Sequence, residues 1–203
     1  MIKRIIFDID GTLISGIDLK PIIIETFKKY GIEDIERINL FISNISEYER
    51  NYNCYDKDLY LNFFSNITGI KLDYNFLKIL FQEAKNAIPN NIVLIREMLS
   101  TLSEYELVLL SNYFEESQRN RLTAMGINNF FSEYYGEKII KPNKQAYMSA
   151  KGKNEPEECL IVGNDKLLDV DIPMSLGFKA LYVDKDGDIK RVEELTPKLI
   201  KKL

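Results

Sequence analysis

The sequence of 203 residues contains no histidine. This absence excludes Ser-His-Asp triads, histidine-ligated zinc sites and histidine general bases. Acid–base chemistry in this chain therefore has to use aspartate, glutamate, lysine, tyrosine or cysteine. A pair of carboxylates is the usual substitute for histidine, and such a pair lies close to the beginning of the sequence.

Cysteine and long apolar runs are also scarce. The two cysteines, Cys54 and Cys159, are far apart and form neither a metal-binding spacing nor a disulfide framework. No apolar run is long enough to span a membrane. The run that follows Lys3 and Arg4 is too short for a signal peptide, because Asp8 ends it. We therefore expect a cytoplasmic protein without a membrane partner.

Positive charge is not in excess. Lysine and arginine number 27 against 31 aspartates and glutamates, so the formal net charge is −4. A nucleic-acid-binding protein usually carries a basic patch, so we expect no nucleic-acid partner. Apolar residues make up 45% of the chain, which is enough for a hydrophobic core. The length fits one large domain or one domain with an insertion, and the oligomeric state stays open.

Residues 2–12 are the most informative segment. The apolar run 5–7 is rich in β-branched residues and stops at turn-forming residues, which is typical of a buried strand. Asp8 and Asp10 follow this run directly, and Gly11-Thr12 come next. In open α/β sheets ligands bind at the carboxyl ends of the strands, so these carboxylates suit a metal ion, a nucleophile, or both.

Strands and helices are predicted to alternate in the second half of the chain. The predicted strands are 107–110, 134–136, 159–162 and 180–183, and the predicted helices are 91–103, 115–125, 143–150, 166–176 and one at the C-terminus. This alternation predicts βαβ units and a Rossmann-like parallel sheet covered by helices on both faces. The fold class is therefore α/β.

Residues 15–88 contain no convincing strand. Helices are predicted at 18–30, 32–43, 55–66 and 73–86, and Asp18 is a candidate N-cap. The many aromatic residues of this segment are expected to form the core of a small helical bundle, with a minority lining a substrate cleft. We predict a core of residues 1–14 and 89–203 and an inserted helical cap of residues 15–88.

Polar side chains follow three of the predicted strands. These residues are Asp8 and Asp10 after the first strand, Ser111 and Asn112 after the second, and Asn164 and Asp165 after the third. Asp169 follows four residues after Asp165, and Lys141 lies in a loop between the second and third of these strands. In a parallel sheet all of these strand ends face the same way, so the side chains are expected to form one site. Carboxylate oxygens suit Mg²⁺, and such a set of groups suits phosphoryl transfer.

These motifs resemble those of the haloacid dehalogenase superfamily, and most closely its phosphatase-type members with a helical cap, such as β-phosphoglucomutase and phosphoglycolate phosphatase. The resemblance covers essentially the whole chain. The first motif matches 8–12, the second Ser111-Asn112, the third Lys141-Pro142, and the fourth 163–165 with Asp169. The four motifs stand in the family's order, each at a predicted strand end or loop, and together they are highly specific.

The resemblance implies a role for each of these residues. Asp8 would be the nucleophile that forms an aspartyl-phosphate, and Asp10 would protonate the leaving oxygen and then activate water. Ser111 and Asn112 would hold the phosphoryl oxygens, and Lys141 would neutralise charge. Mg²⁺ would lie between the Asp8 side chain, the Asp10 carbonyl and the fourth motif.

Asn164 departs from the family pattern, which more often has aspartate at this position. An amide oxygen still ligates Mg²⁺ but brings no charge, and Asp165 or Asp169 could supply that charge directly or through water. The predicted metal ligands are therefore Asp8, Asp10, Asn164, Asp165 and Asp169.

The residue two positions after the nucleophile distinguishes reaction types within the family. Dehalogenases lack the second aspartate, so Asp10 favours phosphatase or phosphomutase chemistry. We predict a phosphatase acting on a small phosphorylated metabolite. A phosphomutase of the β-phosphoglucomutase type uses the same core residues and is the nearest alternative. A catalytically inactive binding module with this fold is the alternative from another class. The identity of the substrate does not follow from the sequence.

Overall fold

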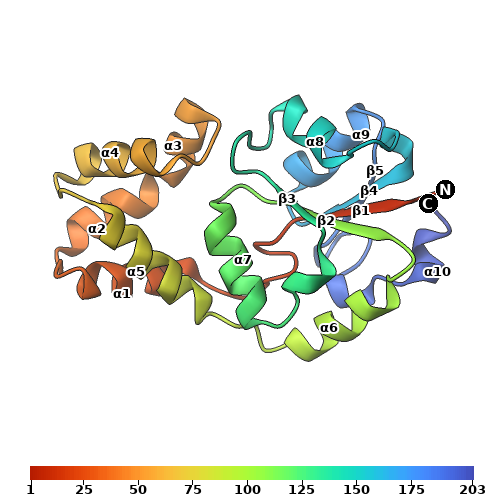
Figure 1. Cartoon of the computed structure of the whole chain (residues 1–203), viewed down its shortest axis with the longest axis horizontal. Helices are drawn as coiled ribbons and strands as arrows, with labels where there is room; N and C mark the ends of the chain where they lie inside the picture. Colours follow the sequence, from red (N-terminus) through yellow and green to blue (C-terminus); the bar gives the residue numbers. More distant parts are fainter.

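The computed structural model describes all residues 1–203 and has the α/β architecture that the sequence predicts. Its centre is a five-stranded sheet in which every neighbouring pair is parallel (Figure 1). The strands are β1 (Arg4–Phe7), β2 (Glu106–Leu110), β3 (Glu133–Tyr135), β4 (Cys159–Gly163) and β5 (Lys179–Tyr182). Their spatial order is β3-β2-β1-β4-β5, which places the first strand of the chain at the centre of the sheet.

Both faces of the sheet are buried. Ile5 and Phe7 of β1 pack in one apolar cluster with residues of α6 (Ile92–Thr101) and α7 (Glu115–Ala124). Ile6 points to the opposite face and packs in a second cluster with α8 (Lys144–Ala150). A strand covered on both faces needs a continuous apolar run rather than an alternating one, which explains the run before Asp8.

The last third of the chain is less regular than the sequence predicts. The expected helix 166–176 is a π-helical turn, Lys166–Asp171, followed by the short α9 (Ile172–Ser175). The C-terminal helix α10 (Pro197–Ile200) is a single turn. It begins at Pro197 because the Thr196 hydroxyl accepts a hydrogen bond from the Leu199 N–H, which caps the helix.

Residues between β1 and α6 form a bundle of five helices, with no strand among them. These helices are α1 (Leu19–Lys29), α2 (Ile35–Ser43), α3 (Ile45–Tyr52), α4 (Lys57–Thr68) and α5 (Tyr74–Lys85). Four of them begin at an aspartate whose carboxylate accepts backbone N–H groups of the first turn, namely Asp18, Asp34, Asp56 and Asp73. Such caps satisfy donors that a helix leaves unpaired at its start.

Helix α3 is the element that the sequence analysis did not predict. Asn44 is both the C-cap of α2 and the N-cap of α3, so no glycine or proline separates the two helices. The helix ends at Asn53, which adopts a left-handed conformation with φ of 53°. A boundary of this kind has no strong sequence signal, because turn-forming residues are what normally mark one.

The bundle has an aromatic core of its own. Tyr48, Tyr60, Phe41, Phe64 and Phe76 are all essentially inaccessible to solvent and belong to one cluster. This agrees with the expectation that most aromatic residues here are structural. Two members of the cluster, Phe114 and Ile140, come from loops of the sheet region and attach the bundle to it. Because the bundle and the sheet region have separate apolar clusters, we propose the division that the sequence predicts, a core of residues 1–14 and 89–203 and a cap of residues 15–88.

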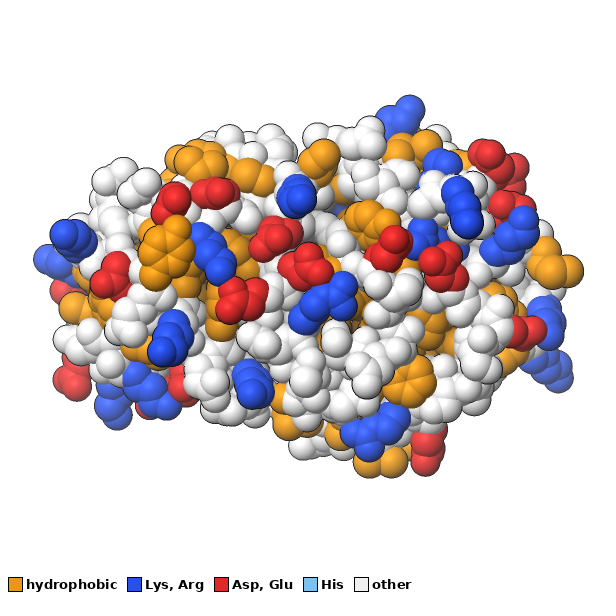
Figure 2. Space-filling model, in the orientation of Figure 1, with side chains coloured by type: hydrophobic (Ala, Val, Ile, Leu, Met, Phe, Trp, Pro, Cys, Tyr) orange, Lys and Arg blue, Asp and Glu red, His pale blue; other side chains and the backbone are white.

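The bundle lies beyond the carboxyl edge of the sheet, on the side away from both chain ends (Figure 1). The face seen in Figure 2 carries acidic and basic side chains interspersed with one another, without a large patch of either sign. No helix combines the length and the hydropathy required to cross a membrane.

Candidate active site

The strand register brings the predicted residues to one edge of the sheet. Phe7 is aligned with Leu109 of β2 and with Val162 of β4. The residues that follow these three positions therefore leave the sheet side by side, and the Asp8 N–H still bonds to the Val162 carbonyl at 3.0 Å. The carboxyl ends of β1, β2 and β4 form one surface facing the helical bundle, as expected for a parallel sheet.

A buried lysine joins two of the predicted carboxylates. Lys141 Nζ lies 2.9 Å from Asp8 Oδ1 and 2.7 Å from Asp169 Oδ1. All three side chains are almost completely buried. Burial by itself lowers the pKa of the Lys141 ammonium, but the two carboxylates outweigh burial and raise that pKa above its ordinary value. Lys141 is therefore a fixed cation beside Asp8.

The pKa of the Asp8 carboxyl is determined by opposing effects. Burial raises the pKa of the Asp8 carboxyl, Lys141 opposes this rise, and the charge of Asp169 adds to it. Because one ammonium serves two carboxylates, the cluster carries excess negative charge. A cation bound at Asp8 would relieve that excess.

The side chain of Asn112 positions Lys141 rather than facing open space. Its Oδ1 accepts from the Lys141 backbone N–H at 2.8 Å, and its Nδ2 donates to the Lys141 carbonyl at 2.9 Å. This double hydrogen bond fixes the loop that carries the lysine. The predicted phosphate contact of Asn112 would thus have to come from its backbone, and the Ser111 hydroxyl remains as the side-chain donor of this motif.

The Asp10 carboxylate is fixed by two residues that the sequence analysis did not identify. Arg121 Nη1 donates to Asp10 Oδ1 at 2.7 Å, and Gln118 Nε2 donates to Asp10 Oδ2 at 2.7 Å. Arg121 Nη1 also donates to Gln118 Oε1 at 2.7 Å, so the three side chains form a closed network. Gln118 Nε2 lies 3.4 Å from the Ser111 hydroxyl as well.

A sequence signal for this network exists but is weak. Gln118 and Arg121 are three positions apart on α7, which places them on one face of the helix. Both are buried, although a buried helix face is normally apolar. Arg121 Nε and Nη2 have no hydrogen-bond partner in the protein. A buried guanidinium with free donors is characteristic of a functional site, because leaving such donors unpaired is costly.

The residues after β4 differ in what they contact. Asn164 Oδ1 lies 3.0 Å from the Thr12 hydroxyl, which is also 3.4 Å from Asp8 Oδ2. The exposed Asp165 uses its carboxylate to cap the following helical turn, accepting from the N–H groups of Leu167 and Leu168. Asp169 Oδ2 accepts from the Asp165 N–H at 3.0 Å, so both of its oxygens are occupied.

The predicted magnesium site can be tested against these contacts. No group of three or more aspartate, glutamate or cysteine side chains is arranged to hold a metal ion. Asp8 and Asn164 nevertheless flank the same hydroxyl, and Asn164 packs so closely on Gly11 that a Cβ there would overlap it. One carboxylate, one amide oxygen and the Asp10 carbonyl fit a magnesium ion that keeps several waters. Both oxygens of Asp169 already accept hydrogen bonds, whereas Asp165 uses only Oδ1 for its cap, so Asp165 and Asp169 stay predicted ligands.

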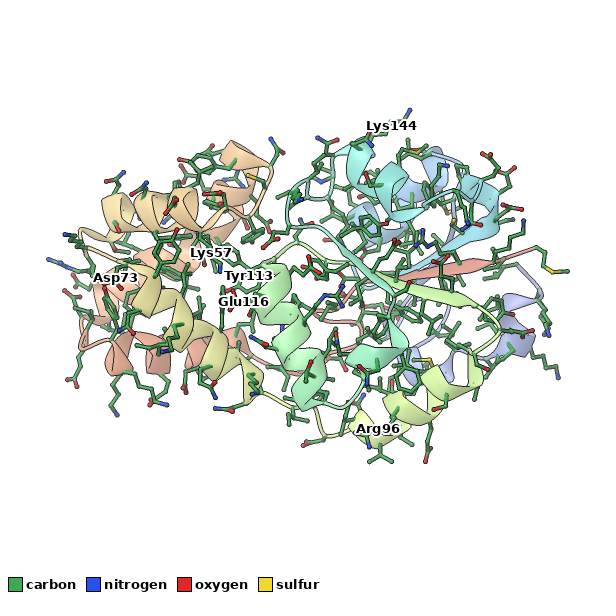
Figure 3. All side chains as sticks on the ribbon, viewed as in Figure 1. Lys57, Asp73, Arg96, Tyr113, Glu116 and Lys144 are labelled. Atoms are coloured by element: carbon green, nitrogen blue, oxygen red, sulfur yellow. The ribbon has the colours of Figure 1, made fainter.

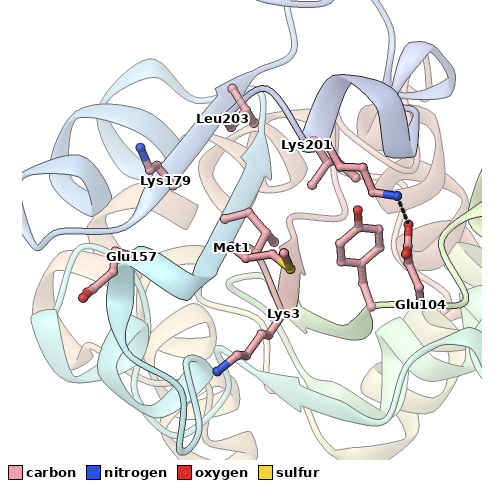
Figure 4. A pocket seen from close by; sticks show the side chains of 10 residues that line it. Met1, Lys3, Glu104, Glu157, Lys179, Lys201 and Leu203 are labelled. Atoms are coloured by element: carbon pink, nitrogen blue, oxygen red, sulfur yellow. Dashed lines mark ion pairs between the residues drawn. The ribbon is translucent and has the colours of Figure 1, made fainter.

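A cavity of about 190 Å³ opens between the sheet edge and the bundle. Its polar lining consists of Asp10, Asn112, Arg121 and Glu49, and most of the rest is apolar. The side of the cavity formed by the sheet region is polar, and the side formed by the helical bundle is mainly apolar. A larger cavity of about 600 Å³ lies at the opposite edge of the sheet, near both chain ends (Figure 4), and includes none of the predicted site residues.

The sequence matches the family model of haloacid dehalogenase-like hydrolases over residues 5–183. No curated protein sequence shows significant similarity to the chain. The matched range contains all of the predicted site residues.

Solved structures with the same fold include both dehalogenases and a phosphatase. The L-2-haloacid dehalogenase of Xanthobacter autotrophicus is 18% identical, with a TM-score of 0.67, over 100% of this chain and 82% of the other. A phosphatase of Thermococcus onnurineus is 24% identical, with a TM-score of 0.60, over 98% of both chains. The hydrolase YfnB of Bacillus subtilis, solved with magnesium, is 16% identical, with a TM-score of 0.67, over 91% of this chain and 90% of the other.

Proposed function

Because the chain belongs to the haloacid dehalogenase-like hydrolase family, we propose that it is a Mg²⁺-dependent phosphatase of a small phosphorylated metabolite. The observation that carries this proposal is the second carboxylate, Asp10, which lines the cavity next to the buried Asp8. The reaction would proceed through an aspartyl-phosphate on Asp8.

In the first step the Asp8 carboxylate attacks phosphorus and the bond from phosphorus to the leaving oxygen breaks. Asp10 donates a proton to that oxygen, so the leaving group departs as an alcohol. Lys141 stays 2.9 Å from Asp8 Oδ1 and balances negative charge during the transfer. The Ser111 hydroxyl, buried beside Gln118, would donate to a phosphoryl oxygen.

In the second step the Asp10 carboxylate accepts a proton from water, and the water oxygen attacks phosphorus. The bond between phosphorus and the Asp8 oxygen breaks, which releases inorganic phosphate, restores the Asp8 carboxylate and leaves Asp10 protonated for the next cycle. Arg121 and Gln118 hold Asp10 in one orientation, so the same side chain is in place for both proton transfers.

Magnesium would be held by the Asp8 side chain, the Asn164 amide oxygen and the Asp10 carbonyl. When bound, it supplies positive charge that reduces the repulsion between a carboxylate nucleophile and an anionic phosphoryl group. Asn164 brings no charge, so this chain is expected to bind the ion more weakly than a site with two carboxylate ligands.

Asp10 also distinguishes the phosphatase proposal from a dehalogenase. A halide leaving group needs no proton, so dehalogenation does not require a general acid at this position. An alkoxide leaving group does need a proton, and the network on α7 presents Asp10 to the cavity. We expect release of phosphate from phosphomonoesters and no release of chloride from L-2-chloropropionate.

The cavity lining favours a phosphatase over a phosphomutase. A mutase of the β-phosphoglucomutase type must hold a bisphosphate, and the second phosphate needs cationic donors on the helical side. None of the lining residues contributed by the bundle is a lysine or an arginine. A coupled assay with hexose 1-phosphate is therefore expected to show no isomerisation, with or without a bisphosphate activator.

The test uses 4-nitrophenyl phosphate, whose leaving group departs without protonation. Asp10→Asn should release about one equivalent of 4-nitrophenolate in a burst and then stall, because hydrolysis of the aspartyl-phosphate still needs a base. Asp8→Asn should give no burst and no turnover. The reaction is followed by stopped-flow absorbance with magnesium present.

Two outcomes would count against the proposal. Full turnover by Asp8→Asn would remove the covalent intermediate from the scheme. A wild-type protein that turns over no phosphomonoester and binds neither beryllium fluoride nor vanadate with magnesium would favour the inactive binding module instead.

A further inference from the structure

Glu49 is the one charged side chain that the helical bundle contributes to the cavity. It lies on α3, the helix without a sequence signal, and faces the cavity together with Asp10 and Asn112. The other lining residues from the bundle are apolar or aromatic, for example Ile22, Ile45 and Tyr60. Glu49 therefore stands alone as a charged group on this wall.

The carboxylate of Glu49 is held in place. The Tyr55 hydroxyl donates to Glu49 Oε1 at 2.7 Å. Tyr55 is itself buried, and its backbone N–H donates to the Glu137 carbonyl at 2.7 Å, which ties this part of the bundle to the sheet region. Glu49 is thus positioned by the same contact that attaches the bundle to the sheet region.

Several groups face this carboxylate. Burial raises the pKa of Glu49, whereas the Tyr55 hydroxyl, the Lys141 ammonium and the Asn112 amide lower it. Lys141 already serves Asp8 and Asp169, and no lysine or arginine forms an ion pair with Glu49. Burial has the largest effect, so the pKa of Glu49 lies above its ordinary value, and the charge of Lys141 acts on it only from beyond ion-pair distance.

The charges that line the cavity do not cancel. Arg121 is paired with Asp10, so its positive charge is already balanced. Glu49 has no such partner, and the lining therefore carries one unbalanced negative charge next to the position of the leaving group. A second anionic group on the substrate would be repelled there, and a hydrogen-bond donor or an ammonium would be attracted.

We propose that Glu49 determines which leaving groups the site accepts: it selects phosphomonoesters whose leaving group carries an ammonium or another hydrogen-bond donor, and it rejects those with a second anion. The proposal rests on the phosphatase function above. The small cavity volume of about 190 Å³, with its apolar walls, further restricts the leaving group to a compact body with that donor at one end.

The test compares 2-aminoethyl phosphate with carboxymethyl phosphate, which have similar size and opposite terminal charge. For wild type and Glu49→Gln, kcat/KM is measured for both compounds, and the ratio between them is the selectivity. Glutamine still accepts from the Tyr55 hydroxyl but carries no charge. We expect the selectivity for 2-aminoethyl phosphate to fall by about tenfold to a hundredfold, since a hydrogen bond to a charged group is lost.

Glu47→Gln is the matched control. Glu47 lies on the same helix, two positions away, is exposed and does not line the cavity. This variant should retain the wild-type selectivity and activity. An equal change in selectivity for both variants, or none for Glu49→Gln, would overturn the proposal.

A binding measurement separates this proposal from the phosphatase proposal. Thermal-shift titrations of Asp8→Asn with the same two phosphoesters should show tighter binding of 2-aminoethyl phosphate, and Glu49→Gln in that background should remove the preference. If the wild-type protein hydrolyses neither compound but the binding preference is present and depends on Glu49, the phosphatase proposal alone is refuted. Hydrolysis of both compounds without any dependence on Glu49 would refute the Glu49 proposal alone.

Discussion

Asp10, the proposed general acid, and the residues that hold it form the most informative unit at the scale of single residues. Asp10 receives one hydrogen bond from Arg121 and one from Gln118, both from the same helix face. Holding a catalytic carboxylate in one orientation lowers the entropic cost of the reaction. The Nε and Nη2 donors of Arg121 are buried and have no partner in the protein, so the guanidinium is held mainly by Asp10 and Gln118.

Replacing Arg121 by methionine tests this positioning role. Methionine keeps an apolar stem but removes the hydrogen bond to Asp10, so kcat should fall by about 10- to 100-fold, with a smaller change in KM. The burst with 4-nitrophenyl phosphate should persist, since that leaving group needs no proton. Arg119→Met, on the same helix but paired with Glu115, is the control and should retain near-wild-type kcat. Equal losses in the two variants would show a merely structural role.

The fourth motif leads to a second prediction at this scale. The Asp165 carboxylate caps a helical turn, and asparagine caps equally well. Asp165→Asn should therefore leave the magnesium concentration for half-maximal activity within about twofold of wild type. Asn164→Ala should raise that concentration by at least about tenfold, because it removes a proposed direct ligand. Titrations of activity with magnesium measure this concentration for both variants. A larger increase in Asp165→Asn than in Asn164→Ala would assign the metal to Asp165.

At the scale of secondary-structure elements, the helical bundle depends on aspartate caps. Asp73 Oδ1 accepts from the N–H groups of Asn75 and Phe76 at the start of α5 (Figure 3). Helix α5 packs against α1 and also against α7, so it joins the bundle to the sheet region.

Removing this cap has a predictable cost. Asp73→Ala should lower the free energy of unfolding by about 1 kcal/mol, while Asp73→Asn, which keeps a capping acceptor, should change it by only a few tenths. Urea denaturation followed by circular dichroism measures both values. Equal destabilisation by the two variants would mean that the charge of Asp73, and not its capping bond, stabilises α5.

At the scale of the whole molecule, the bundle and the sheet region are connected by a few contacts between distant residues. Lys57 of α4 pairs with Glu116 of α7 at 2.6 Å, in the region where Figure 3 shows Tyr113. The Asn53 carbonyl accepts from the Ile140 N–H at 3.2 Å. Phe114, at the start of α7, packs against aromatic rings of the bundle with centroids 5.1–5.4 Å away.

Phe114 is therefore the residue through which folding of the two parts should be coupled. Phe114→Ala should cost about 3–5 kcal/mol and divide the thermal transition into two, because the bundle loses the larger of its two apolar attachments. Phe131→Ala, in the cluster of the sheet region, should also destabilise but leave a single transition. Differential scanning calorimetry distinguishes these results, and a single transition in both variants would contradict the coupling role.

Much of the architecture followed from the sequence by itself, for a physical reason. Strands buried on both faces need continuous apolar runs, and the residues that end those runs necessarily lie at one edge of a parallel sheet. Asp8, Lys141 and Asp169 were therefore predicted to share a site, and the structure brings them into contact. Their chemical roles, and that of magnesium, stay predictions.

The tertiary structure alone decided which additional side chains reach that edge. Gln118 and Arg121 look like ordinary polar residues of a helix, and Glu49 lies on a helix without a clear boundary signal. Their contacts with Asp10 and with the cavity depend on how α7 and the bundle pack against the sheet edge, which local patterns do not encode. Likewise, only the folded chain shows Asp165 as a helix cap and Asn112 as the support of Lys141, because each uses its side chain on a backbone group nearby in space.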